Sequence, residues 1–203
     1  MFITRTRLLI AAVAAITLTV AGCGDDSTTA TETTTSAAAA TTTASTRTDF
    51  NEADVTFLQM MYPHHAQAVD MAKMVPGRSQ NPQLLALAAA VEAAQAPEMQ
   101  QITTLLESFG KPAPSAGEHG GHGGHEMPGM MTPEQMTALE NATGPEFDRQ
   151  WMQMMIEHHT GAIDMANTVL ADGVNPDTKA LATSIVAAQQ AEIDQMKQML
   201  GQS

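Results

Sequence analysis

Apolar side chains recur every three to four residues in four long segments of this chain. The segments cover approximately residues 50–76, 82–109, 145–170 and 176–200. This period is typical of amphipathic α-helices, whereas strands would need strict alternation or short β-branched runs. No segment shows a credible strand pattern, so the sequence predicts an all-α protein.

Helix-capping residues mark the expected helix starts. Asp49, with Glu52 three positions later, matches a capping box before the first helix. Asn81 and Asn175 each precede a proline, which is favoured in the first helical turn. Pro-Gly at 76–77 ends the first helix. Short connections then make two helical hairpins, which must bury their apolar faces against each other, so we expect an antiparallel four-helix bundle.

The second hairpin repeats the first. The segment that begins Phe57-Leu-Gln-Met-Met-Tyr-Pro-His-His returns at Trp151, 94 positions later (151 − 57), as Trp-Met-Gln-Met-Met-Ile-Glu-His-His. The same offset holds without a gap to Leu106 and Leu200. We therefore predict one folded domain over residues 49–203 with approximate two-fold symmetry. Its parts are repeat 1 at 49–110, a Gly/His/Met-rich linker at 111–144 with a short helix at 133–141, and repeat 2 at 145–203.

The N-terminal residues have the features of an export signal. Arg5 and Arg7 precede a short apolar run, and Val20-Ala21-Gly22-Cys23 resembles a bacterial lipoprotein box. We expect residues 1–22 to be a signal peptide and Cys23 to carry lipid. The alternative is a stray cysteine beside an ordinary cleavage site. Residues 23–48 are mostly Thr, Ala and Ser and should form a disordered tether, which would anchor the domain to the outer side of the bacterial cell membrane.

Charge and cysteine content narrow the function classes. The net charge of −13 becomes −15 without Arg5 and Arg7, because 22 acidic residues then face seven basic ones. Nucleic acid is therefore not an expected partner. Cys23 is the single cysteine, so the folded domain has no disulfide and no thiolate.

Methionine and histidine side chains offer metal ligands at helical spacing. In each candidate pair the methionine precedes the histidine by four residues, which makes the two side chains neighbours on one helix face. Two further methionines lie on the same line, two turns beyond the first histidine of each repeat. The pairs are Met60 with His64, Met61 with His65, Met154 with His158 and Met155 with His159, and the further methionines are Met71 and Met165.

Thioether and imidazole together favour a soft monovalent cation. Cu(I) fits best, Ag(I) imitates it, and the imidazoles alone also accept Cu(II) or Zn(II). Thioethers bind without losing a proton and survive in oxidising compartments. The structural alternative is that methionines at helical spacing fill a core and that histidines at its edge are hydrogen-bonded. Two adjacent histidine pairs, each preceded by Met-Met, favour a copper ion.

The linker contains the remaining histidines of the chain. His119, His122 and His125 lie in a glycine-rich tract with three methionines at 127, 130 and 131. Such a tract could capture a metal and pass it on. The alternative is a spacer whose histidines are incidental.

The Met-Met-x-x-His-His strips, each followed by Ala-x-Asp-Met-Ala, resemble the bacterial domain-of-unknown-function family numbered 305. The resemblance covers the chain from about Asp49 to Leu200. It implies a ferritin-like four-helix fold, an extracytoplasmic location and, as in the CopM-like members, copper binding linked to copper resistance. By this similarity the four paired histidines and their upstream methionines are the ligands.

Three functions follow as hypotheses. The first is a lipid-anchored copper-binding protein for sequestration, relay or resistance, with a metal-delivery protein as a partner. The second is a ferritin-like or copper-dependent oxidoreductase. Di-iron sites use Glu-x-x-His, and no histidine here follows a glutamate by three residues, so no catalytic residue is predicted. The third is a metal-free interaction module.

Overall fold

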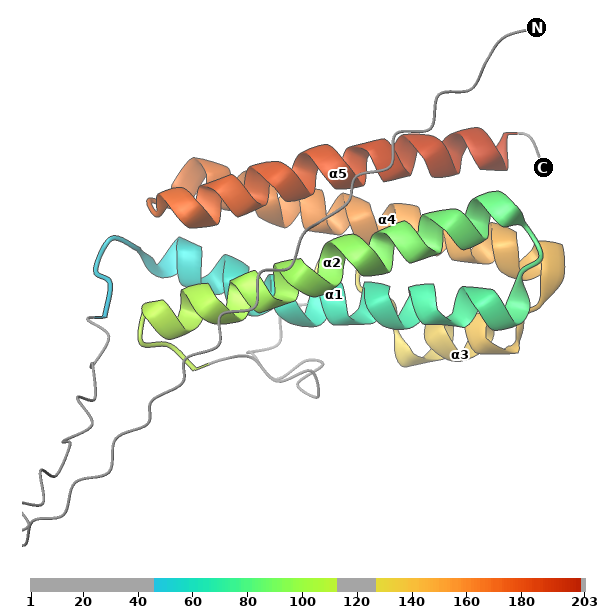
Figure 1. Ribbon diagram of the computed structural model, residues 1–203, viewed down its shortest axis with the longest axis horizontal. Helices are drawn as coiled ribbons and strands as arrows, with labels where there is room; N and C mark the ends of the chain where they lie inside the picture. The colour runs from blue at the N-terminus through green and yellow to red at the C-terminus, as the bar shows by residue number, and fades with distance from the viewer. Residues whose placement is uncertain (1–45, 113–126, 202–203) are drawn as a thin grey trace, which may run out of the picture. The chain divides into compact units, whose positions relative to one another are not determined.

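The structure, a computed structural model, describes residues 46–112 and 127–201 (Figure 1). Every regular element in these two ranges is a helix, so the predicted all-α fold is confirmed. Cys23, the proposed signal peptide and the linker histidines lie outside the described residues. The helices are α1 (Glu52–Arg78), α2 (Pro82–Ser108), α3 (Pro133–Asn141), α4 (Gly144–Asp172) and α5 (Pro176–Leu200).

The four long helices form the expected bundle. α1 packs along α2 and α4 packs along α5, which gives one hairpin per sequence repeat. The two hairpins meet mainly where α1 contacts α4, and α2 approaches α5 at fewer places. α3 lies against α1 and α4, on the side away from α5 (Figure 1). The contact between α1 and α4 is therefore the main junction of the two repeats.

The helix caps follow the sequence at two starts and differ at one. Asn81 and Asn175 cap α2 and α5 through their side-chain oxygens, as predicted. The capping box of α1 consists of Asn51 and Asp54, so the prediction of Asp49 with Glu52 was wrong. Asp49 instead accepts two hydrogen bonds from Arg47, a residue that the sequence assigns to the tether. Asp54 is the residue whose carboxylate can also reach the second hairpin.

The end of the linker packs into the fold. Met131 is buried, and the amide of Gln67 donates to its carbonyl and accepts from its N–H at 2.9 and 2.8 Å. On the neighbouring helix, the backbone of Gly161 contacts the Pro128–Gly129 turn so closely that any Cβ there would overlap the carbonyl of Pro128. Met131 is therefore a core residue and not part of a flexible donor tract, because its backbone is fixed by Gln67 and its side chain is covered.

None of the helices in the described ranges combines the length and the apolarity that crossing a bilayer requires.

Asp54 ties the two hairpins together. Its carboxylate is fully buried and accepts from the N–H of Asn51 in its own helix at 2.9 Å. It also accepts from the N–H groups of Val174 and Asn175, which open α5, at 3.0 and 3.2 Å. The residue 94 positions later, Asp148, is half-buried, and its Oδ1 has no partner among the described residues.

We therefore expect Asp54→Ala to lower the free energy of unfolding by about 3 kcal/mol, since buried N–H groups lose a charged acceptor. The matched variant Asp148→Ala should change it by less than about 1 kcal/mol. Urea unfolding of both variants measures the difference. Equal effects at the two positions would contradict the role given to Asp54.

Candidate metal centre

The four paired histidines lie inside the bundle. His64, His65, His158 and His159 are each fully buried. Helical geometry alone left open whether the pairs lie in the interior or on a flank, because it does not fix how the hairpins dock. The structure answers that question: the imidazoles lie in the core at the junction of α1 and α4.

The closest imidazole contact joins the two repeats. The ring centroids of His64 and His158 are 3.8 Å apart, with 38° between the ring planes. Within the second tandem pair, the rings of His158 and His159 are 6.2 Å apart. The sequence predicts pairs within each hairpin, but the nearest imidazole neighbours come from equivalent positions of the two hairpins.

In each tandem pair, the second histidine bonds to a carboxylate from the second helix of its hairpin. His65 Nε2 donates to Glu98 of α2 at 2.8 Å, and His159 Nε2 donates to Glu192 of α5 at 2.7 Å. The two glutamates are also 94 positions apart (192 − 98). Neither was predicted from the sequence, although both are acidic residues that recur at the repeat offset.

The linker turn holds a third imidazole. His64 Nε2 lies 3.0 Å from the carbonyl oxygen of Pro128. A carbonyl can only accept, so this nitrogen carries the proton and Nδ1 of the neutral ring presents a lone pair. Gly129 and Gly161 allow this arrangement, because side chains at these positions would overlap the facing backbone.

These hydrogen bonds leave the same ring atom unused in each case. Nδ1 of His64, His65 and His159 is buried and finds no hydrogen-bond partner within the described ranges, and both ring nitrogens of His158 are in the same state. Where a carboxylate or carbonyl accepts Nε2–H, the neutral ring offers its Nδ1 lone pair, the form in which imidazole binds metals. The four rings together therefore present at least four buried nitrogen lone pairs that a metal ion could use.

Burial keeps the rings of His64 and His158 neutral. It lowers the pKa of His64 to about 3, helped by the neighbouring His65 and opposed by the bond to Pro128. It also lowers the pKa of His158 well below its ordinary value, and the proximity of His64 adds to this shift. Neutral imidazole is the ligand form, so protons do not compete for these two rings near neutral pH.

The predicted methionine ligands differ in burial. Met61, Met71 and Met155 are fully buried, Met154 and Met165 nearly so, and Met60 is half-buried. Within the parts of the chain that the structure describes, no group of three His, Cys, Asp or Glu side chains is placed to hold one ion. An ion at the imidazoles therefore needs a donor of another kind, and thioethers one turn away are such donors.

The predicted ligands His119, His122 and His125 belong to the part of the linker outside the described residues, so their role stays a prediction.

The chain is similar to known proteins in both sequence and fold. Residues 54–200 match the family model described as "Domain of unknown function (DUF305)". A DUF305 fragment from Deinococcus radiodurans is 32% identical, with a TM-score of 0.67 over 77% of this chain and 100% of that one. A putative secreted DUF305 protein from Streptomyces coelicolor is 30% identical, with a TM-score of 0.67 over 74% of this chain and 93% of that one.

Several of the similar structures, all of one protein, contain a metal. CopM in the Cu(II)-bound form is 35% identical, with a TM-score of 0.64 over 73% of this chain and 96% of that one. CopM structures in Cu(I)-bound, Ag-bound and apo forms also match. The chain spans about a third of the curated relative that it matches, the uncharacterized protein L153 of Acanthamoeba polyphaga mimivirus, with 40% identity over 53 residues, 26% of this chain and 35% of that protein.

The low pKa values of His64 and His158 predict a pH-dependent stability. Below about pH 6.5 the unfolded chain protonates these rings, whereas the folded chain does not, so the free energy of unfolding falls as the pH falls. Between pH 6.5 and 5 each ring should contribute a loss on the order of 2 kcal/mol. Urea unfolding across this pH range measures it.

The control is His158→Gln, which removes one of the two titrating rings and keeps a polar side chain. Its stability should depend less on pH than that of the wild type. An unchanged slope would show that His158 does not remain neutral in the fold.

Proposed function

The chain belongs to the DUF305 family, and on that premise we propose that it is an extracytoplasmic copper-binding lipoprotein. It binds Cu(I), accepts Ag(I) or Cu(II) as well, and serves metal sequestration, relay or resistance. The observation that carries the proposal is the group of four buried histidines with unpartnered Nδ1 atoms, flanked by thioethers. CopM, a similar protein with Cu(I)-bound, Cu(II)-bound and Ag-bound forms, supports it.

The donor set fits the proposed ion. Leaving buried polar atoms unpaired costs about 1–3 kcal/mol each, so several lone pairs at one place favour a ligand that can use them. Imidazole and thioether are neutral donors, which suits a monovalent soft cation in a dry interior better than a hard divalent one. When bound there, each copper ion would be held by at most two of the histidines at positions 64, 65, 158 and 159, and Met61 and Met155, one helical turn away, would supply the thioether donors.

The surroundings of the histidines favour binding over di-iron chemistry. A ferritin-like di-iron site uses carboxylates that ligate the ions. Glu98 and Glu192 instead each accept a bond from a separate imidazole, which is how carboxylates orient a histidine ligand. The two glutamates are therefore positioning residues in this proposal.

The cellular placement is part of the same proposal. Lipid on Cys23 and the tether at 23–48 would hold the domain at the outer side of the membrane, and the similar putative secreted protein from Streptomyces coelicolor is consistent with an extracytoplasmic location. His119, His122 and His125 would collect ions before they reach the core. A delivery protein would exchange metal with the domain.

Removing ligands should remove copper binding. For residues 23–203 with Cys23→Ser, we expect the His64→Ala/His65→Ala and His158→Ala/His159→Ala variants to lose high-affinity Cu(I) binding in a chelator competition under reducing conditions. The Met61→Leu/Met155→Leu variant keeps the core volume. It should bind at least about tenfold more weakly, which corresponds to about 1.4 kcal/mol.

Met196→Leu, at another fully buried methionine, is the matched control and should bind as the wild type does. If Cu(I) affinity is the same in all of these variants, the proposed function is wrong and a metal-free interaction module remains.

The positioning role of the glutamates makes a separate prediction. In Glu98→Gln/Glu192→Gln the side chains keep their size, but their amides can donate to Nε2, which moves the imidazole proton to Nδ1. Copper affinity should fall by about 10–100-fold, the range found when outer partners of metal-bound histidines are removed.

Glu107→Gln/Asp194→Asn, at two exposed carboxylates of the same two helices, is the matched control because it removes two charges without removing a bond to an imidazole. An affinity that is unchanged in Glu98→Gln/Glu192→Gln would show that the carboxylates do not select the ring atom.

A further inference from the structure

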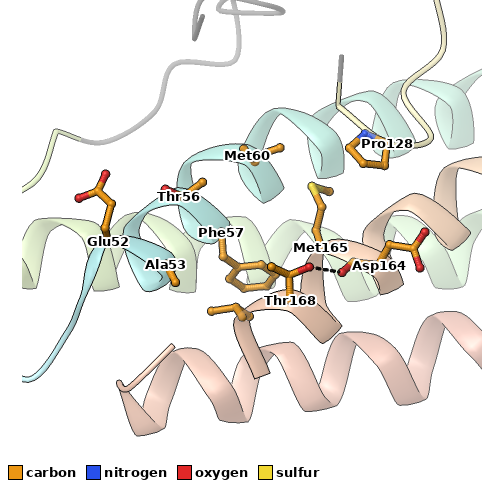
Figure 2. Close-up of a pocket in the computed structure, with 10 residues that line it drawn as sticks. Glu52, Ala53, Thr56, Phe57, Met60, Pro128, Asp164, Met165 and Thr168 are labelled. Carbon is orange, nitrogen blue, oxygen red and sulfur yellow. Dashed lines mark hydrogen bonds between the residues drawn. The ribbon is translucent and has the colours of Figure 1, made fainter. Parts of the chain in front are cut away.

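A groove between α1 and α4 lies beside the histidine cluster, and none of the described helices lies over it. It has a volume of about 420 Å³, and Phe57, Met60 and Met165 are among its lining residues. Figure 2 shows these side chains between the two helices, with Glu52 toward one end of the groove and Pro128 toward the other. The lining is mostly apolar, which is unusual for a solvent-facing surface.

The repeat gives this groove a counterpart in the same molecule. The residues that lie 94 positions before or after its main lining residues are their counterparts in the other repeat. These counterparts pack in one hydrophobic cluster with Met131 of the linker and Leu139 of α3. The corresponding pairs are Ala53 with Phe147, Phe57 with Trp151, Met60 with Met154, Met165 with Met71, Thr168 with Met74 and Val169 with Val75.

The two grooves differ in what covers them. In the covered groove Leu139 of α3 is fully buried, and Arg78 donates to the carbonyl of Glu140, which fixes the far end of α3. Met154 is buried there, whereas its counterpart Met60 is half-buried. The molecule thus contains both a groove of this kind and an example of the segment that fits it.

We propose that the open groove binds a short amphipathic helix of another protein, which presents a leucine or methionine as Leu139 does and carries basic residues at its flanks. The basic flanks follow from the rim, where Glu52 and Asp164 are exposed. The net charge of −13 also favours a partner with basic residues. The same charge opposes the approach of a second copy of this chain.

This docking site is a separate feature from metal binding. Where the proposed function holds, the docking site also indicates how a partner protein would reach the metal ligands. A helix in the groove would cover Met60 and Met165, whose counterparts Met154 and Met71 pack in one cluster with Leu139 of α3. The partner would therefore contact two predicted thioether ligands, as a protein that delivers or removes metal must. The groove itself consists of protein side chains and does not depend on a bound ion.

The test uses a peptide derived from the segment that the molecule already binds. The probe is a fluorescent peptide of residues 127–142 with Glu134→Lys and Glu140→Lys, titrated with residues 23–203 carrying Cys23→Ser, in the presence of a copper chelator. We expect saturable binding by fluorescence anisotropy. The same peptide with Leu139→Asp should bind at least about tenfold more weakly, as expected when the central apolar anchor is lost.

A matched pair of protein variants locates the binding. Thr168 and Thr183 are both exposed, and each hydroxyl donates to the carbonyl four residues earlier, but only Thr168 lines the groove. Thr168→Arg adds bulk and positive charge to the groove and should weaken peptide binding by at least about tenfold. Thr183→Arg should leave it within about twofold of the wild type, as for surface changes away from an interface.

Three outcomes would overturn the docking proposal: no saturable binding, equal binding of the Leu139→Asp peptide, or equal effects of the two arginine variants. Self-association of the protein that Thr168→Arg abolishes would also overturn it, because the occupant would then be a second copy. Since the assay excludes copper, peptide binding without Cu(I) affinity would leave the docking site standing and the proposed function wrong.

Discussion

The burial of four imidazoles at the junction of α1 and α4 is the constraint on which the rest of the structure depends. A polar ring can be buried only if its nitrogens are bonded or the ring stays neutral. The chain meets this condition with acceptors from three other segments, Glu98 of α2, Glu192 of α5 and Pro128 of the linker. Each histidine bond therefore also fixes the position of a neighbouring segment.

Much of this fold could be predicted from the sequence, because helices and hairpins follow from local signals. Apolar periodicity and the two Asn-Pro starts define the long helices, and the 94-residue offset gives the pairing of equivalent parts. The partners of the histidines could not be predicted, because the face of one helix does not fix how the next one docks. The α1 cap shows the same limit: its capping box uses Asn51 and Asp54, and Asp54 also accepts a hydrogen bond from Val174, which lies 120 residues away.

One linker makes two similar halves unequal. At the repeat-related positions 67 and 161, Gln67 holds the backbone of Met131, while Gly161 lets the Pro128–Gly129 turn contact α4. The linker can take only one course between the hairpins, so it gives His64 a hydrogen bond that His158 lacks and places α3 over one groove. A duplicated sequence with a single connection cannot produce two identical sites.

At the thioethers, this inequality separates the two halves by access and not by chemistry. Met60 and Met154 occupy equivalent positions and offer the same thioether, but the first is half-buried and the second is covered. Thioethers bind soft cations without releasing a proton, so pH does not distinguish them. Access to the surface is the property that differs. In the proposed function, exchange of metal with the outside therefore belongs to the half that α3 leaves open.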